Sequence, residues 1–190
     1  MIFITGPHGS GKSRVAESLQ AKGFPFLDMG PAIRALHRAE CQPGVSLADW
    51  REQGRKRFGE VFPDYKLLEK AHAVLYGAGN IKVQDLVIVG ERSYQSAQFL
   101  LQNVSANGWV KHRGLILYLD APFEVLHGRY NLREGSPTTP EEFGKLLRRD
   151  EEIGLLELKT RADCVLPAHH DLPVVNGRVE AVLRENGYNI

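Results

Sequence analysis

Residues 6–13 read GPHGSGKS, and this stretch decides the fold because it matches the phosphate-binding pattern GxxxxGK(S/T) at every fixed position. An apolar run, MIFIT at residues 1–5, precedes it and has the character of a strand. An amphipathic run, SRVAESLQAK at residues 13–22, follows it and has the character of a helix. The pattern therefore predicts a loop, between a strand and a helix, that binds a nucleoside triphosphate.

Each residue type in this loop has a physical role in holding phosphate. Glycine permits the tight curl that points successive N–H groups at an anion. The helix N-terminus adds partial positive charge, Lys12 reaches the outer phosphates and acts in catalysis, and the hydroxyl of Ser13 is a magnesium ligand. The residues expected to contact the nucleotide are Gly6, His8, Gly9, Ser10, Gly11, Lys12 and Ser13. We therefore expect ATP and Mg²⁺ as cofactors.

Composition restricts the remaining function classes. The 190 residues are 43 % hydrophobic and 25 % charged, which suggests one ordinary globular domain. A formal net charge of +1 gives no bulk attraction to nucleic acid or membranes, so nucleic acid enters only as a possible acceptor. Two cysteines are too few for a disulfide framework or a structural zinc site, and no apolar stretch reaches membrane-spanning length. We expect a cytoplasmic monomer or homodimer.

Apolar runs alternate with helical patterns along the chain, which predicts a parallel sheet covered by helices on both faces. After the first strand, further strands are expected at 24–28 (FPFLD), 86–89 (LVIV), 115–120 (LILYLD) and 163–166. After the first helix, further helices are expected at 32–40, 46–58, 64–76, 94–106, after Pro122, at 139–160 and at 178–186.

Three motifs add a family resemblance to this pattern: DMGPAIR at 28–34, VIVGER at 87–92 and a basic stretch at 129–150. With the phosphate-binding loop, they resemble the adenylate-kinase-like branch of P-loop kinases, and most of all small archaeal-type predicted nucleotide kinases with dephospho-CoA-kinase-like features. The resemblance implies a three-layer α/β/α fold, with a five-stranded parallel sheet in the order 2-3-1-4-5. It also implies a single domain, 1–190, with an acceptor-binding helical insert at about 31–80 and a helical lid at about 129–150.

The resemblance implies that two arginines grip the acceptor. Arg34 matches the arginine of the family's TGDxxR element, and Arg92 matches that of its DGxR element. A planar guanidinium suits this task because it can donate two parallel hydrogen bonds to a phosphate. The chain departs from the family at the two acids of these elements, which are replaced by Pro31 and Val89.

Two carboxylates are candidates for the role of the missing acid. Glu91 lies two residues after Val89, and Asp28 ends the second expected strand, where dephospho-CoA kinases carry an acid. Either could organise the water around magnesium. Asp28 could instead accept the proton of a hydroxyl acceptor. Both residues are therefore expected to be catalytic, with Asp28 reaching the metal through water.

The basic stretch that ends at Asp150 resembles the mobile lid of these kinases. Arg129 and Arg133 are four residues apart and share one helix face, while Arg148 and Arg149 approach from a later helix. Arginines that close over the moving phosphoryl group stabilise its charge and expel water. Arg129 and Arg133 are therefore expected to be catalytic, and Arg129 also to contact ATP.

These residues predict an ATP-dependent kinase with a nucleotide-type acceptor. A nucleoside monophosphate fits the arginine pair, Arg34 and Arg92, because its phosphate is already a nucleophile. The alternative is a hydroxyl-directed kinase that uses Asp28 and acts on a dephospho-CoA-like molecule or a hydroxymethylated base in DNA. A second alternative is an ATP-hydrolysing binding switch, although a switch has little need for lid arginines that enclose the γ-phosphate.

Overall fold

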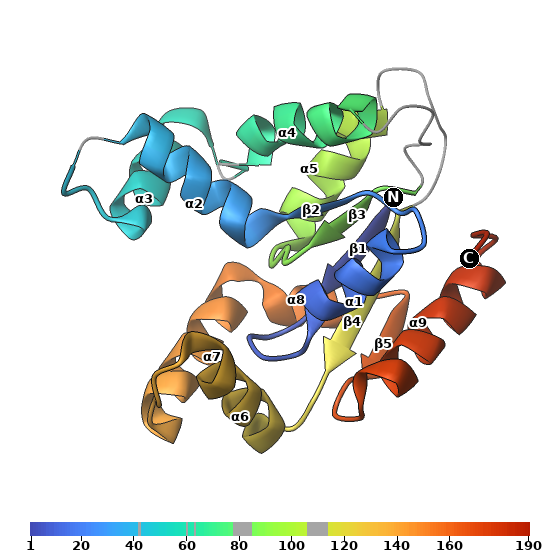
Figure 1. The fold of residues 1–190 in the computed structure, drawn as a ribbon. Coiled ribbons are helices and arrows are strands. Elements are labelled where there is room, and N and C mark those ends of the chain that lie inside the picture. The colour runs from blue at the N-terminus through green and yellow to red at the C-terminus, as the bar shows by residue number, and fades with distance from the viewer. Residues whose placement is uncertain (42, 60, 63, 78–84, 106–113) are drawn as a thin grey trace.

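Five parallel strands form the central sheet of a computed structural model that describes residues 1–41, 43–59, 61–62, 64–77, 85–105 and 114–190 (Figure 1). They are β1 (Ile2–Thr5), β2 (Phe26–Asp28), β3 (Val87–Val89), β4 (Leu115–Asp120) and β5 (Cys164–Pro167). Their order across the sheet is β2-β3-β1-β4-β5, and each neighbouring pair is parallel. The order 2-3-1-4-5 is thereby confirmed.

Helices cover both faces of this sheet. They are α1 (Lys12–Gln20), α2 (Met29–Glu40), α3 (Leu47–Phe58), α4 (Asp64–Gly77), α5 (Tyr94–Ser105), α6 (Phe123–Glu134), α7 (Pro140–Ile153), α8 (Leu155–Thr160) and α9 (Leu172–Glu185). Successive strand residues point to opposite faces, so Phe3 packs with buried residues of α2–α5 and α8, whereas Ile2 and Ile4 pack with α1 and α9. The three-layer α/β fold is confirmed.

The largest differences from the sequence expectation are at two helix boundaries. The single helix expected at 139–160 is divided at Gly154, whose φ of 122° no other residue type adopts readily. A Cβ at this position would meet the backbone of Arg92 and Ser93, at 3.5 and 3.6 Å, so the break brings the chain close to the end of β3. The last helix starts at Leu172 rather than at 178, with Pro173 in its first turn.

The domain limits stay predictions. Residues 42, 60, 63 and 78–80 of the expected insert, and the end of the helix expected at 94–106, lie outside the described residues. Across the part of the chain that is described, no helix is both long and apolar enough to cross a bilayer.

An aromatic cluster holds α3 against the turn that precedes α4. The rings of Trp50 and Phe62 meet edge to face at a centroid distance of 4.8 Å, and Phe58 and Tyr65 pack on Phe62 at 5.8 and 6.0 Å. Gly54 faces this cluster, and a Cβ on it would overlap the Phe62 ring. The absence of a side chain at Gly54 therefore lets the two segments approach each other.

We expect Gly54→Ala to destabilise the protein by about 1–3 kcal/mol, because the added methyl group must displace a buried ring. The urea unfolding midpoint measures this loss. Gly128→Ala is the matched control, since Gly128 lies in α6 with open space around its Cβ position, and alanine there should be neutral or stabilising by up to about 1 kcal/mol. An equal effect of the two substitutions would contradict the packing account of Gly54.

Candidate active site

The phosphate-binding loop lies at the carboxyl end of β1, in the middle of the sheet. Gly6, Gly9 and Gly11 have positive φ values of 139°, 81° and 88°. A Cβ at Gly9 would overlap the backbone of Leu126, and one at Gly6 would overlap the carbonyl oxygen of Leu119. Glycine at these two positions therefore serves both the curl of the loop and its close approach to β4 and α6.

Lys12 is folded over this loop. Its Nζ donates hydrogen bonds to the carbonyl oxygens of Gly6 and Pro7, at 2.8 and 2.7 Å, and to Ser10 Oγ at 3.2 Å. Burial, aided by the charge of Arg92, lowers the pKa of Lys12 to about 7. A bound anion would offset the cost of this buried charge, as expected for a lysine that serves phosphate.

Asp28 and Ser13, both expected near the metal, lie in direct contact. The Ser13 hydroxyl donates to Asp28 Oδ2 at 2.9 Å, and Asp28 Oδ1 accepts from the Gly30 N–H at 3.1 Å, which caps α2. A hydroxyl and a carboxylate are the hard oxygen donors that suit magnesium. The pair would hold the ion directly through Ser13 and through water from Asp28. Within the described residues, no group of three or more potential metal-ligating side chains exists, so phosphates and water would complete the shell.

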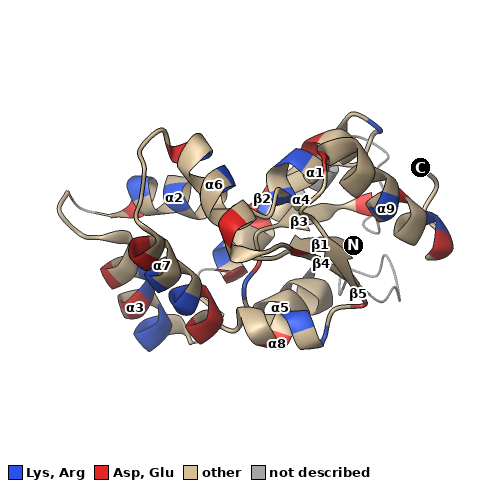
Figure 2. Ribbon diagram, turned by 90° about the horizontal axis from the view of Figure 1, so that it is seen from below, with Lys and Arg blue, Asp and Glu red and all other residues tan. Residues whose placement is uncertain are grey.

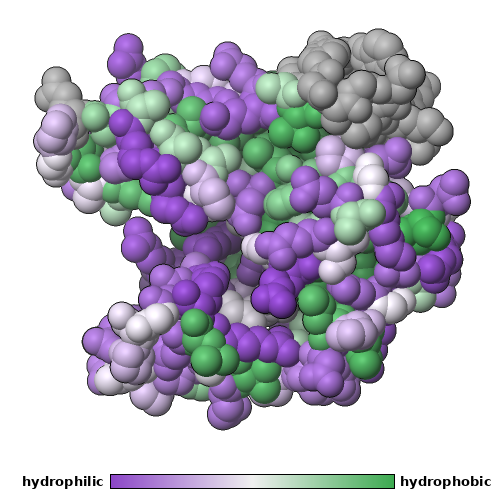
Figure 3. All heavy atoms as spheres, viewed as in Figure 1, coloured by the Kyte–Doolittle hydropathy of each residue, from purple (hydrophilic) through white to green (hydrophobic). Residues whose placement is uncertain are grey.

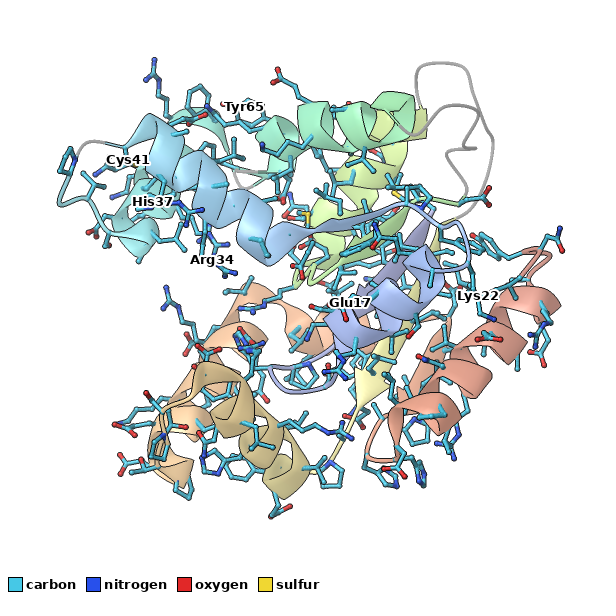
Figure 4. The ribbon with its side chains drawn as sticks, viewed as in Figure 1. Glu17, Lys22, Arg34, His37, Cys41 and Tyr65 are labelled. Atoms are coloured by element: carbon cyan, nitrogen blue, oxygen red, sulfur yellow. The ribbon has the colours of Figure 1, made fainter. Side chains whose placement is uncertain are left out.

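Arg34 lies beside this pair at the mouth of a crevice. A Cβ on Gly30 would stand 3.4 Å from both Arg34 Nη1 and Asp28 Oδ1, so the two side chains flank the same glycine. Figure 4 shows Arg34 pointing from α2 toward the side of the molecule that carries α6 and α7. Figure 3 shows the surface hollowed there and lined by hydrophilic residues. Arg34 makes no ion pair with any residue that the structure describes.

Arg92 is in a different setting from Arg34. Its Nη2 is 2.8 Å from His8 Nε2 in the phosphate-binding loop, and its Nη1 donates to Asp150 Oδ1 of α7 at 2.5 Å. The structure thus brings Arg92 against the loop, while Arg34 stands on the α2 side. The acceptor-binding role of both arginines stays a prediction.

Glu91 is buried, and its carboxyl group faces the backbone that follows β3. Its Oε1 accepts the backbone N–H groups of Arg92 and Ser93, at 2.8 and 3.0 Å. Burial and the neighbouring charge of Asp64 raise the pKa of Glu91 to about 8, and burial raises that of Asp64 to about 6. Two backbone N–H groups already occupy Glu91 Oε1, and the role of Glu91 as the substitute acid stays a prediction.

The two arginines of α6 have separate partners. Arg129 donates from Nη1 to the carbonyl oxygen of Ala168 at 2.5 Å and from Nη2 to that of His170 at 3.1 Å. It therefore joins α6 to the loop after β5. Arg133 pairs with Glu134 at 2.6 Å and lies over the Tyr130 ring at 5.2 Å. Their catalytic roles stay predictions.

Sequence reasoning does not single out Asp150, although its side chain is completely buried. Hydropathy does not indicate that Asp150 is buried, because the residue stands in the charged run RRDEE. Acidic and basic residues interleave along α7 (Figure 2). One signal was present. Asp150 follows the buried Phe143 by seven residues, and that spacing returns to the same face of a helix.

Comparison with known proteins places this site in context. The sequence pattern of the family described as AAA domain matches residues 2–153. A shikimate kinase from Salinibacter ruber is 31 % identical over 192 residues, which cover 96 % of this chain and 83 % of that protein. A dephospho-CoA kinase from Novosphingobium aromaticivorans is 26 % identical, with 97 % and 93 % covered. The shikimate kinase structure from Bacteroides thetaiotaomicron matches the fold with a TM-score of 0.59, at 16 % identity and 98 % coverage of each chain. The resemblance to P-loop kinases is confirmed.

The state of Glu91 can be measured through stability. Between its ordinary pKa of 4.5 and about 8, the folded protein keeps a proton on Glu91 that the unfolded chain releases. Wild-type stability should therefore fall as the pH rises through this window, by up to about 1.4 kcal/mol per pH unit. Glutamine cannot ionise, so Glu91→Gln should lack this loss. In urea unfolding at pH 6, 7 and 8, the free energy of unfolding of the variant should therefore increase relative to that of the wild type as the pH rises.

Glu142→Gln is the control for this measurement. Hydrogen bonds from Thr139 lower the pKa of Glu142, so its contribution to stability is lost only as the pH falls into the acid range. The difference in free energy of unfolding between Glu142→Gln and the wild type should stay constant between pH 6 and 8. If Glu91→Gln behaves in the same way, Glu91 is ionised in the folded protein.

Proposed function

We propose that this chain, which belongs to the AAA domain family and is an ATP-dependent phosphotransferase, moves the γ-phosphoryl group of ATP onto a hydroxyl group of a small acceptor. One observation carries the proposal. The carboxylate of Asp28 accepts a hydrogen bond from Ser13, in the loop that serves the ATP phosphates.

A hydroxyl acceptor must lose its proton as it attacks, and a carboxylate beside the phosphates can take that proton. Asp28 ends β2 and caps α2, which leaves its Oδ2 turned toward the loop. Relatives named shikimate kinase and dephospho-CoA kinase support acceptors other than a nucleoside monophosphate.

The other residues supply positioning and charge. Lys12 would turn from the loop carbonyls to the outer phosphate oxygens, and Arg34 would hold the acceptor beside Asp28. Magnesium, when bound, would withdraw charge from the phosphate oxygens. The hydroxyl proton would pass to Asp28 Oδ2 as the new phosphorus–oxygen bond forms and the bond to ADP breaks.

A nucleoside monophosphate is the second candidate acceptor, and the position of Arg34 favours it. The Arg34 guanidinium has no carboxylate partner among the described residues and points into the crevice (Figure 4). Such a group can bind a phosphate bidentately. In that reaction no base is needed, and Asp28 would serve magnesium alone.

Labelled ATP with a panel of nucleosides, nucleoside monophosphates, dephospho-CoA and hydroxymethylated DNA would separate these functions. With a hydroxyl acceptor, we expect Asp28→Asn to lower kcat by about 10²–10⁴-fold and to remove the acidic limb of the pH–rate profile. Asparagine still caps α2, so the fold should persist. Asp49→Asn, at an exposed acid in the first turn of α3, is the matched control and should keep wild-type kcat.

Magnesium dependence distinguishes the two roles of Asp28. If the residue orders water around the ion, the defect of Asp28→Asn should ease as magnesium is raised. A defect that persists at saturating magnesium supports the proton-accepting role. Phosphorylation of monophosphates alone, or full activity of the variant with a hydroxyl acceptor, would overturn the proposal.

A further inference from the structure

Three distant parts of the chain meet around the guanidinium of Arg92. His8 belongs to the phosphate-binding loop, Arg92 follows β3, and Asp150 lies near the end of α7. Arg92 Nη1 donates to Asp150 Oδ1 at 2.5 Å, and Arg92 Nη2 is 2.8 Å from His8 Nε2. One side chain thus links the loop to the helix that ends the basic segment.

The protonation of His8 follows from this geometry. Burial, with the charges of Arg92 and Lys12, lowers the pKa of His8 to about 3. His8 Nε2 therefore accepts the hydrogen bond from Arg92. The distance of 3.6 Å from His8 Nε2 to Asp150 Oδ2 is a contact with a neutral ring and not an ion pair, because the lone pair of Nε2 already faces Arg92.

Burial of the Asp150 carboxylate costs desolvation free energy, which its charged neighbours offset. Its side chain is fully buried, and Oδ2 lacks a hydrogen-bond donor among the described residues. Burying a carboxylate is unfavourable unless a cation compensates it. Removal of the charge on Asp150 would therefore leave the Arg92 guanidinium without its carboxylate partner.

Arg92 keeps donors that no described residue uses. A guanidinium has five N–H groups, and among the described residues only Asp150 and His8 take two of them, which leaves three for a ligand. Its charge acts on Lys12, the residue that serves the outer phosphates. A Cβ on Gly154, where α7 ends, would stand 3.5 Å from the Arg92 carbonyl oxygen, so the end of α7 also passes close to the Arg92 backbone.

We propose that Arg92 binds the γ-phosphoryl group of ATP, and that Asp150 is a positioning residue that keeps the Arg92 guanidinium turned toward the phosphate-binding loop. This assigns Arg92 to the donor side of the reaction and leaves Arg34 on the acceptor side. The assignment concerns the bound nucleotide, so it holds whichever acceptor is used.

Calorimetric titration in magnesium with ADP, and with ADP plus beryllium fluoride as a mimic of the γ-phosphoryl group, tests this without any acceptor. The gain in affinity on adding beryllium fluoride should fall by about 10–100-fold in Arg92→Ala, because a charge-assisted hydrogen bond is lost. ADP alone should bind within about threefold of the wild type, since Arg92 is assigned no contact with it. An undiminished gain would overturn the assignment and return Arg92 to the acceptor.

A double-mutant cycle tests the role of Asp150. Asp150→Asn alone should reduce the beryllium fluoride gain by about 3–10-fold, and it should add nothing in the Arg92→Ala background if it acts through Arg92. Additive losses would show that Asp150 acts independently and would overturn its positioning role. Glu40→Gln is the matched control, because it breaks another 2.5 Å ion pair, with Lys66, between α2 and α4. It should leave the gain unchanged.

If Asp150→Asn does not fold, Arg92→Lys replaces it in the same titrations. Lysine keeps the positive charge beside the buried Asp150, but its three donors sit on a single nitrogen and lack the planar fork that lets a guanidinium reach Asp150 and a phosphate at two separate positions. We expect ADP affinity to be retained and most of the gain to be lost. A full gain with lysine would contradict the need for a guanidinium held by Asp150.

Discussion

The contact between Ser13 and Asp28 is the constraint on which the arrangement of the site depends. It joins the first turn of α1 to the end of β2 and the start of α2, and so it fixes the α2 side of the crevice relative to the phosphate-binding loop. The contact exists because parallel strands end at one edge of the sheet, and β3 alone separates β2 from β1. A hydroxyl that is expected to bind a metal and a carboxylate that could serve a metal or a proton are thereby placed within one hydrogen bond.

The opposite side of the loop is fixed by charge instead of by strand order. Arg92 and Asp150 tie the loop to α7, while Arg129 ties α6 to the segment after β5. The molecule has a net charge of only +1, yet it buries charged or titratable groups around one loop. Such groups are costly to bury and cluster at functional sites, which agrees with the proposal that phosphoryl transfer takes place here.

Local patterns explain what the sequence could predict. The apolar runs placed the five strands, and the Thr139–Glu142 capping box placed the start of α7. Because Asp28 stands at the carboxyl end of an expected strand, the sequence also predicted that it would lie near the phosphate-binding loop. The break at Gly154 was missed because a glycine in a helical pattern is often tolerated. The setting of Arg92 was missed because it depends on a buried acid 58 residues away, and no local signal reports long-range charge pairing. The assigned roles of the arginines and of Glu91 remain predictions for the same reason.

The distances along the chain between the members of this network have a consequence for folding. His8 is synthesised before Arg92, which follows 84 residues later, and Asp150 comes a further 58 residues on. Contacts of such long range close only after the intervening strands have paired, because each requires a large loop to be ordered first. A growing chain therefore carries the complete phosphate-binding motif long before it has the partners that orient it. The phosphate-binding loop is thus made before the groups that orient it, and it reaches its working geometry only once they have joined the fold.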